Sequence, residues 1–155
     1  MNTDTYILFE LNGAAFGVRS SEVQHVEMLE HITPVPNTAP AVDGVVFSRG
    51  QVFPALNLRA RFGLPRQPAT PSTRLIFLRV RDRVVALIVD SAREFERIPA
   101  TEIRPVEATL VGVEGNYVEG VATVKSRSVL ILDVGKVLTI EEITPPAGAP
   151  ASIAS

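Results

Sequence analysis

The chain has 155 residues, of which 46% are apolar and 21% charged, and its formal net charge is −2. This balance is typical of one globular domain, and it excludes both a disordered chain and a general attraction to nucleic acid or anionic membranes. No apolar run reaches the roughly 20 residues that span a bilayer, and no basic region precedes the N-terminal apolar stretch. Cysteine is absent, which removes disulfides and thiolate metal sites. We therefore expect a soluble, cytoplasmic protein.

The N-terminal region predicts a hairpin followed by a short helix. Residues 6–11 are rich in strand-forming side chains, Asn12-Gly13 is a strong two-residue hairpin signal, and residues 15–18 can return as the partner strand. Ser21 followed by Gln24 has the spacing of a capping box, which predicts a short helix with Val23 and Val26 on one face.

The stretch from residue 44 to residue 64 has the clearest pattern. Two apolar segments, 45–47 and 52–58, flank Ser48-Arg49-Gly50-Gln51, which predicts a β-hairpin with a glycine-containing turn. A short helical turn is expected after Leu58, ending at Gly63. An arginine in a turn between two apolar strands is interpreted as a contact residue.

The remainder of the chain predicts further short strands and a tail. A proline-rich connector, 65–72, leads to a second hairpin with arms 75–80 and 84–89, both so apolar that we expect them to be covered on both faces. Asp90, which follows this hairpin, is interpreted as the cap of the next turn. Further strands are predicted at 95–98, 117–124 and 129–134, with a last helix near 138–143 and a disordered tail from Thr144.

The two halves of the chain are related in sequence. Val42-Asp43-Gly44-Val45 aligns without a gap on Val118-Glu119-Gly120-Val121, and the same register places Arg49 on Lys125. The segment 32–35 likewise resembles 103–106, and the first hairpin resembles the second. Any two β-meanders can share an apolar pattern, but here glycine, acid and a basic residue recur in order, which favours a duplicated unit. Each half would form a small barrel or sheet of about five strands, with an apolar groove where the halves meet.

The sequence offers no catalytic or metal-binding constellation. His25 and His31 have no cysteine nearby to complete a zinc site, and we interpret both as exposed polar residues. Neither a nucleophile elbow nor a phosphate-binding loop occurs. We therefore predict a protein that is not an enzyme, with no catalytic residues, no metal and no cofactor.

Eight short segments follow one another in a specific order and spacing: VQHV at 23–26, TPVPN at 33–37, VDGV at 42–45, RG at 49–50 with VFP at 52–54, NLR at 57–59, FGL at 62–64, IVD at 88–90 and YVEGV at 117–121. Together they resemble the CheW-like family of bacterial chemotaxis coupling proteins, from about residue 6 to residue 142. The resemblance implies a mostly β fold of two SH3-like five-stranded β-barrel subdomains in a pseudo-twofold arrangement, with short helices. It implies one domain at 5–143, with halves at about 5–72 and 73–143 that leave room for exchange of strands or helices, and a tail at 144–155.

The resemblance also implies a function. Members of this family act as non-catalytic adaptors that couple membrane chemoreceptors to a CheA-type histidine autokinase, in arrays at the inner face of the membrane. The helical tip of the receptor would dock in the groove between the two barrels. The residues that would line this groove are Val23, Val26, Val45 and Val89, with Arg49 as a polar contact. For the four valines, ordinary core packing is the competing interpretation.

The kinase would bind through its regulatory domain, which resembles this fold and would meet the protein barrel against barrel. Gly44 and Gly50 are assigned a supporting role at that surface. The resemblance also allows self-association in array rings, and it implies no nucleic acid and no direct membrane insertion.

Two alternatives stay open at this point. The chain could be a regulatory CheW-like domain of a sister pathway, in surface motility or second-messenger signalling, that binds a kinase or response regulator without classical receptors. It could also be a small β-barrel ligand-binding module. The chain departs from the family in having Phe47-Ser48 where asparagine and leucine are common, and Asn57 where aspartate is frequent. These departures bear on which receptor and kinase it matches.

Overall fold

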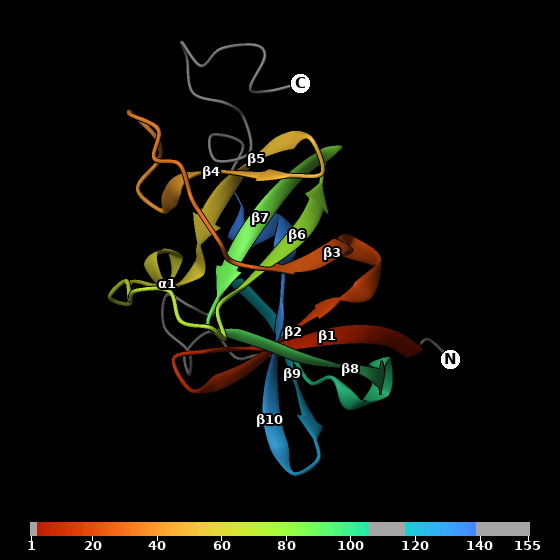
Figure 1. Ribbon diagram of the computed structural model, residues 1–155. Helices are drawn as coiled ribbons and strands as arrows, with labels where there is room; N and C mark the ends of the chain where they lie inside the picture. Colours follow the sequence, from red (N-terminus) through yellow and green to blue (C-terminus); the bar gives the residue numbers. More distant parts are fainter. Residues whose placement is uncertain (1–2, 106–116, 139–155) are drawn as a thin grey trace.

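The computed structural model describes residues 3–105 and 117–138, which form a mostly β structure of two five-stranded sheets (Figure 1). The predicted tail, and the part of the predicted last helix beyond residue 138, lie outside the described residues. In the described part of the chain, no helix combines the length and the apolar character that crossing a bilayer requires.

Each sheet mixes strands from both halves of the chain. Sheet A has the order β8-β1-β2-β10-β9, with bounds β1 Thr3–Leu11, β2 Ala14–Arg19, β8 Ser91–Pro99, β9 Val118–Val124 and β10 Arg127–Leu132. Sheet B has the order β3-β6-β7-β5-β4, with bounds β3 Val23–Met28, β4 Val42–Ser48, β5 Gln51–Asn57, β6 Arg74–Val80 and β7 Arg83–Val89. The short helices are η1 Ser20–Glu22, α1 Leu58–Arg61, η2 Ala100–Glu102 and α3 Val134–Val137.

The halves of the chain exchange their hairpins. The β1–β2 hairpin of the first half pairs with β8 and β10 of the second, and the β6–β7 hairpin of the second half pairs with β3 and β5 of the first. The two hairpins enter their sheets through equivalent parallel pairs, β2 with β10 and β7 with β5. The sheets therefore do not follow a simple division near residue 72, although the extent of the domain itself stays a prediction.

Backbone pairing confirms the duplication. Thr33 forms an isolated bridge with Val45, and Arg104 forms the equivalent bridge with Val121. The first helix after each copy begins in the same way, because the Asn57 side chain accepts a hydrogen bond from the Ala60 amide and the Asp133 side chain accepts one from the Lys136 amide. In the described part of the chain, four tight hairpin turns each have two residues with positive φ: Asn12-Gly13, Arg49-Gly50, Arg81-Asp82 and Lys125-Ser126.

The core has three parts, and strand alternation explains them. On β1, Ile7 and Phe9 point into a large cluster that also contains side chains of sheet B, whereas Tyr6 and Leu8 point into a smaller cluster inside sheet A. A third cluster fills the inside of sheet B. Both faces of β1, β6 and β7 are buried in these clusters, which explains why the sequences of these strands are almost continuously apolar. The expected barrels are open sheets, because no ladder joins β8 to β9 or β3 to β4 among the described residues.

The helix predicted after Ser21 is wrong. The segment forms one 3₁₀ turn, η1, and then strand β3, which pairs with β6. A capping box contributes about 1 kcal/mol, and pairing with the otherwise open edge of a buried strand outweighs it. Val23 and Val26 still lie on one face, because a bulge between Val23 and His25 shifts the register.

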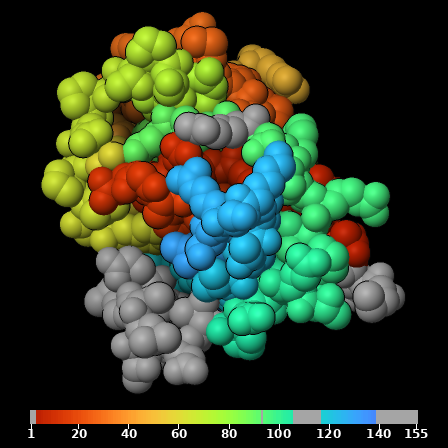
Figure 2. All heavy atoms as spheres, turned by 90° about the horizontal axis from the view of Figure 1, so that it is seen from below, coloured from red at the N-terminus to blue at the C-terminus, as the bar shows by residue number. Residues whose placement is uncertain are grey.

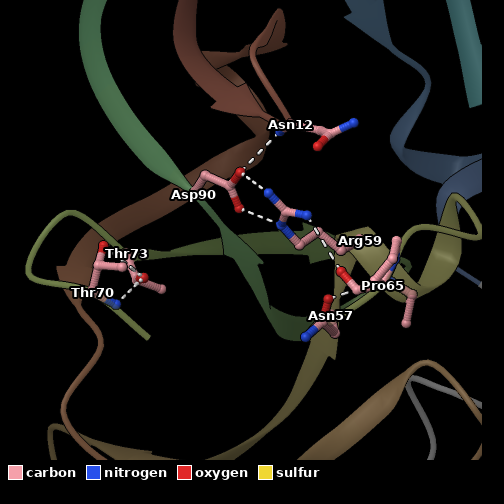
Figure 3. Close-up of polar contacts among 8 residues, drawn as sticks. Asn12, Asn57, Arg59, Pro65, Thr70, Thr73 and Asp90 are labelled. Carbon is pink, nitrogen blue, oxygen red and sulfur yellow. Dashed lines mark hydrogen bonds and ion pairs between the residues drawn. The ribbon is translucent and has the colours of Figure 1, made fainter. Parts of the chain in front are cut away.

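A partly buried ion pair and a backbone hydrogen bond to the same carboxylate link the two sheets (Figure 3). The Arg59 guanidinium on α1 donates to both carboxylate oxygens of Asp90 at the end of β7, at 2.9 and 2.7 Å. Asp90 also accepts a 2.9 Å hydrogen bond from the backbone amide of Asn12, in the β1–β2 turn of sheet A. Burial alone would raise the pKa of Asp90, but the hydrogen bonds from Arg59 and Asn12 outweigh it and hold this pKa below its usual value. Asp90 is thus a connector between the sheets and not the local cap that the sequence suggested.

We expect Arg59→Ala to lower the free energy of unfolding by about 2 kcal/mol, because it leaves a half-buried carboxylate without its charged partner. Urea denaturation measures this change. Arg66→Ala is the matched control, since Arg66 pairs with Asp43 while its side chain is 48% exposed, and its loss should be below about 1 kcal/mol. Equal losses for the two variants would contradict the role given to Arg59.

We expect Gly44→Ala to destabilise the protein by about 3 kcal/mol, because φ is +147° and an added Cβ would lie 2.1 Å from the Thr33 carbonyl oxygen. Gly50→Ala in the same hairpin is the control. Its φ is +78° with open space around it, so its loss should be about 1 kcal/mol. Thermal or urea unfolding of both variants measures these losses. A larger loss for Gly50→Ala than for Gly44→Ala would contradict the close approach of Thr33 to Gly44 as the cause.

Candidate partner-binding surface

Side chains join the two edge strands of sheet B where the backbone does not. His25 and Glu27 of β3 point to the inside of the sheet, and the His25 Nε2 atom lies 2.7 Å from the Glu27 carboxylate and 3.3 Å from the Ser48 hydroxyl at the end of β4. The Ser48 hydroxyl donates to the same carboxylate. The His25 ring stacks on Phe77, with centroids 4.2 Å apart. We call this contact between β3 and β4 the seam; it shows that His25 is not the exposed residue predicted from the sequence.

The seam has the residue types of a nucleophilic triad without its geometry. In such a triad the serine and the carboxylate contact opposite nitrogens of the histidine. Here both contact Nε2, while Nδ1 is buried without a partner among the described residues, and Ser48 is only 6% exposed. The described residues also contain no group of three or more histidines and acids that could hold a metal ion. The cluster therefore joins the two edge strands of sheet B, and its geometry is not that of a nucleophilic triad.

Apolar side chains lie on the outer face along the seam. Because neighbours on a strand point to opposite faces, the residues that flank the seam residues point outward: Val26, Met28 and Phe47 are 37%, 58% and 66% exposed. Val52 pairs with Phe47, and Pro54 pairs with Val45. Val45, Val52 and Pro54 are half-buried and extend the same outer face. We call this set the seam patch: Val26, Met28, Val45, Phe47, Val52 and Pro54. Exposed apolar side chains gathered on neighbouring strand ends of a folded protein typically mark an interaction site.

Arg49 stands at the end of the seam patch, in the turn between β4 and β5. Its equivalent in sheet A is Lys125, whose ammonium lies 3.2 Å from Glu94 and 3.5 Å from Glu96 on β8. The hydrogen bond with Glu94 is the main reason that the pKa of Lys125 is raised. Arg49 forms no hydrogen bond or ion pair with any residue that the structure describes.

Strand register explains this difference between the two turns. Leu8 on β1 and Phe77 on β6 lie at the same distance from their hairpin turns. Glu94 pairs with Leu8 and His25 pairs with Phe77, so His25 occupies the place of Glu94. Two residues further along the strand, Glu27 occupies the place of Glu96. In sheet B one of the two acids is replaced by histidine, and the other is engaged within the seam. The guanidinium of Arg49 is consequently available to a partner.

The structure brings together most of the predicted site residues. Val26 and Val45 belong to the seam patch, Arg49 and Gly50 form the adjoining turn, and Gly44 is buried against Thr33. Val23, on the outer face of β3, is half-buried against the core. The residues expected to serve two different partners thus lie on one pair of strands. Val89 does not join them: it is 1% exposed within the core cluster between the sheets, so a partner docking on the folded protein does not reach it.

The most exposed members of the patch are not among the residues that the sequence predicts for partner binding. In the sequence Phe47 stands out only as a departure from the family pattern, and Met28 follows the residues predicted to form a short helix. The alternation V-Q-H-V-E-M at 23–28 was the signal that could have found β3, because a strand places His25 and Glu27 on one face and Val26 and Met28 on the other.

Comparison with known proteins places the chain in a family. Residues 5–142 match the family model of the CheW-like domain. The chemotaxis protein CheW of Bacillus subtilis is 32% identical over 138 residues, which cover 87% of this chain and 86% of that protein. Its namesake in Klebsiella aerogenes is 27% identical over 138 residues, covering 89% and 83%. The crystal structure of the scaffolding protein TtCheW from Thermoanaerobacter tengcongensis has the same fold, with a TM-score of 0.81 at 22% identity over 92% of each chain.

A family model that spans nearly the whole described fold, together with relatives that match over most of their own length, leads to one assignment. The chain belongs to the CheW-like domain family.

Proposed function

We propose that this protein is a non-catalytic adaptor of bacterial chemotaxis that holds chemoreceptors and a CheA-type histidine kinase together. Its family membership supports this proposal, since the similar proteins are named as chemotaxis proteins and the similar structure is described as a scaffolding protein. The observation that carries it in this chain is the seam patch, an exposed apolar surface that ends in an arginine with no partner among the described residues. Such a surface suits binding, and nothing in the seam suits catalysis.

The receptor tip is the partner we assign to the outer side of this surface. A receptor tip is helical, and an amphipathic helix binds through apolar side chains at spacings of three and four. Val26 and Val45 would contact that apolar face, and Phe47 would supply the largest anchor. Arg49 would pair with a carboxylate of the receptor, because a guanidinium can donate two parallel hydrogen bonds to one carboxylate.

The regulatory domain of the kinase is the second partner. We assign it to the backbone edge of β4, which Gly44 and Gly50 shape, and not to the outward-pointing side chains of the hairpin that we assign to the receptor. Gly44 allows the close approach of the Thr33 carbonyl that fixes the edge of β4, and Gly50 provides the positive φ of the turn. The hairpin would then present a preformed edge and little conformational entropy would be lost on binding.

A rigid adaptor can transmit a receptor signal without chemistry of its own. The shared core makes both sheets move as one body, so a displacement at the receptor is passed to the kinase, which then shifts between its own states. Each contact needs only modest affinity, because assembly in an array raises the effective concentration of all partners. We place the protein at the inner face of the membrane through such arrays, where copies can also contact one another.

We predict that Arg49→Ala weakens binding to the receptor about tenfold, the loss of one charged hydrogen-bonded pair worth roughly 1.4 kcal/mol. Co-sedimentation with receptor-containing membranes, at a series of protein concentrations, measures the change. The melting temperature should not fall, since Arg49 is exposed and bonds to no described residue.

Lys125→Ala is the matched control, because Lys125 occupies the equivalent turn but is held by Glu94 and Glu96 of its own sheet. Receptor binding should stay within about twofold of wild type in this variant. If Arg49→Ala bound receptor as wild type does, or if both variants lost binding equally, the assignment of Arg49 would fail.

A further inference from the structure

A cavity of about 170 Å³ lies at one end of sheet A, which we call the mouth of the sheet. None of the contacts proposed above for the adaptor function involves this cavity. It lies at the end of the sheet where the β1–β2 and β9–β10 turns meet, since the Arg127 guanidinium donates to the Gly13 carbonyl across that end at 3.1 Å. Figure 2 views the molecule from the side of the β9–β10 hairpin, which is drawn in blue between the red N-terminal strands and the green β8. Its lining combines apolar side chains, among them Leu8, Ala15, Val124 and Val129, with charged side chains such as Glu94 and Lys125.

The duplicated fold shows what fills this space in the other copy. Measured from their hairpin turns, Leu8 and Phe77 occupy equivalent places, as do Val129 and Phe53. In sheet B the mouth is packed with rings, because Phe77 stacks on His25 and meets Phe53 edge to face, with centroids 4.2 and 5.3 Å apart. Phe77 is fully buried as a result, whereas Leu8 keeps 8% of its surface exposed.

Two further positions follow the same trend, whereas Val124 of the lining is larger than its equivalent Ser48. Ala15 of sheet A stands where sheet B has Val84, and Glu94 stands where sheet B has His25. Sheet A therefore carries a smaller or non-aromatic side chain at both of these places, on an equivalent backbone. The cavity is the volume of the aromatic side chains that sheet B has and sheet A lacks.

Charged groups surround the opening but are paired with one another. Lys125 is held by Glu94 at 3.2 Å, and Arg127 donates to Glu10 at 2.9 Å. A ligand that enters therefore meets an apolar floor and a rim whose charges are already balanced, which favours an uncharged apolar group. An apolar protein cavity of about 150 Å³ is large enough to bind benzene, and the aromatic rings at the equivalent places of sheet B favour an aromatic ring over a saturated one.

We propose that this cavity is a binding site for one uncharged, benzene-sized aromatic ring, which completes in sheet A the packing that Phe53, Phe77 and His25 provide in sheet B. The ring can be presented as the side chain of a phenylalanine in a partner protein or as a free aromatic molecule. The site lies on sheet A and is separate from the seam patch on sheet B.

Methyl NMR of the full chain tests the proposal directly. The probes are benzyl alcohol, a free ring, N-acetyl-phenylalaninamide, a ring on a peptide backbone, and cyclohexylmethanol, a saturated ring of similar size. We expect saturable shifts of the Leu8, Val124 and Val129 methyl groups with both aromatic probes, at concentrations at least threefold lower than for cyclohexylmethanol. Tighter binding of N-acetyl-phenylalaninamide than of benzyl alcohol, by tenfold or more, would identify a protein side chain as the source. Comparable affinities would identify a free aromatic molecule.

Variants that copy sheet B into sheet A supply the control. Val129→Phe copies Phe53 and should place a ring in the cavity, which lowers the affinity for both aromatic probes at least tenfold without lowering the melting temperature. Ala15→Val copies Val84 and fills less of the cavity than Val129→Phe does, and it should also reduce the affinity for the aromatic probes. It keeps the test valid if Val129→Phe does not fold. The absence of saturable shifts in the wild type, equal binding of the saturated ring, or unchanged binding in the folded variants would overturn the proposal.

Discussion

The exchange of hairpins between the two halves is the constraint on which the rest of the structure depends. Each sheet has five strands. In sheet A the β1–β2 hairpin comes from the first half of the chain and the other three strands from the second half, whereas in sheet B the β6–β7 hairpin comes from the second half and the other three strands from the first. Neither half could therefore complete its own sheet if the other were absent. The same exchanged strands supply side chains of the large core cluster between the sheets, such as Phe9 of β1 and Leu78 of β6. Asp90, which binds Arg59 and the backbone amide of Asn12, adds a polar link at one end of this contact. We therefore expect the adaptor to behave as one cooperative unit, although its sequence is a tandem repeat.

On this common backbone the two copies carry different side chains at the places that matter for binding. In sheet B the mouth is filled by aromatic rings, a seam of His25, Glu27 and Ser48 closes the edges, and the cation of the β4–β5 turn is left for a partner. In sheet A the cation of the β9–β10 turn is engaged by acids of β8, and the mouth stays open. A duplicated fold thus provides two unlike surfaces without any change of architecture. That arrangement fits an adaptor, which must hold different partners in a fixed relation.

The elements that depend on local signals could be predicted from the sequence. The turns at Asn12-Gly13 and Arg49-Gly50, the two-residue period of the strands and the repeat of glycine and acid are all properties of short segments. What failed depends on distant pairing. Residues 23–28 form a strand because β6 offers an unpaired edge, which the capping box at Ser21 cannot reveal. Asp90 binds Arg59 and Asn12, which are remote in sequence. Val89 and Val26 are the same residue type, but Val89 lies in the core and Val26 on the surface. Only the fold distinguishes them.

Native-state hydrogen exchange tests the central claim most directly, because it gives a free energy of opening for each protected amide. If the exchanged hairpins make the two sheets one cooperative unit, the slowest amides of β1 and β2 in sheet A and of β6 and β7 in sheet B should open with the same free energy. That value should equal the free energy of global unfolding measured with urea. A set of amides confined to one sheet that opens at a clearly lower free energy, while the other sheet stays protected, would contradict this account.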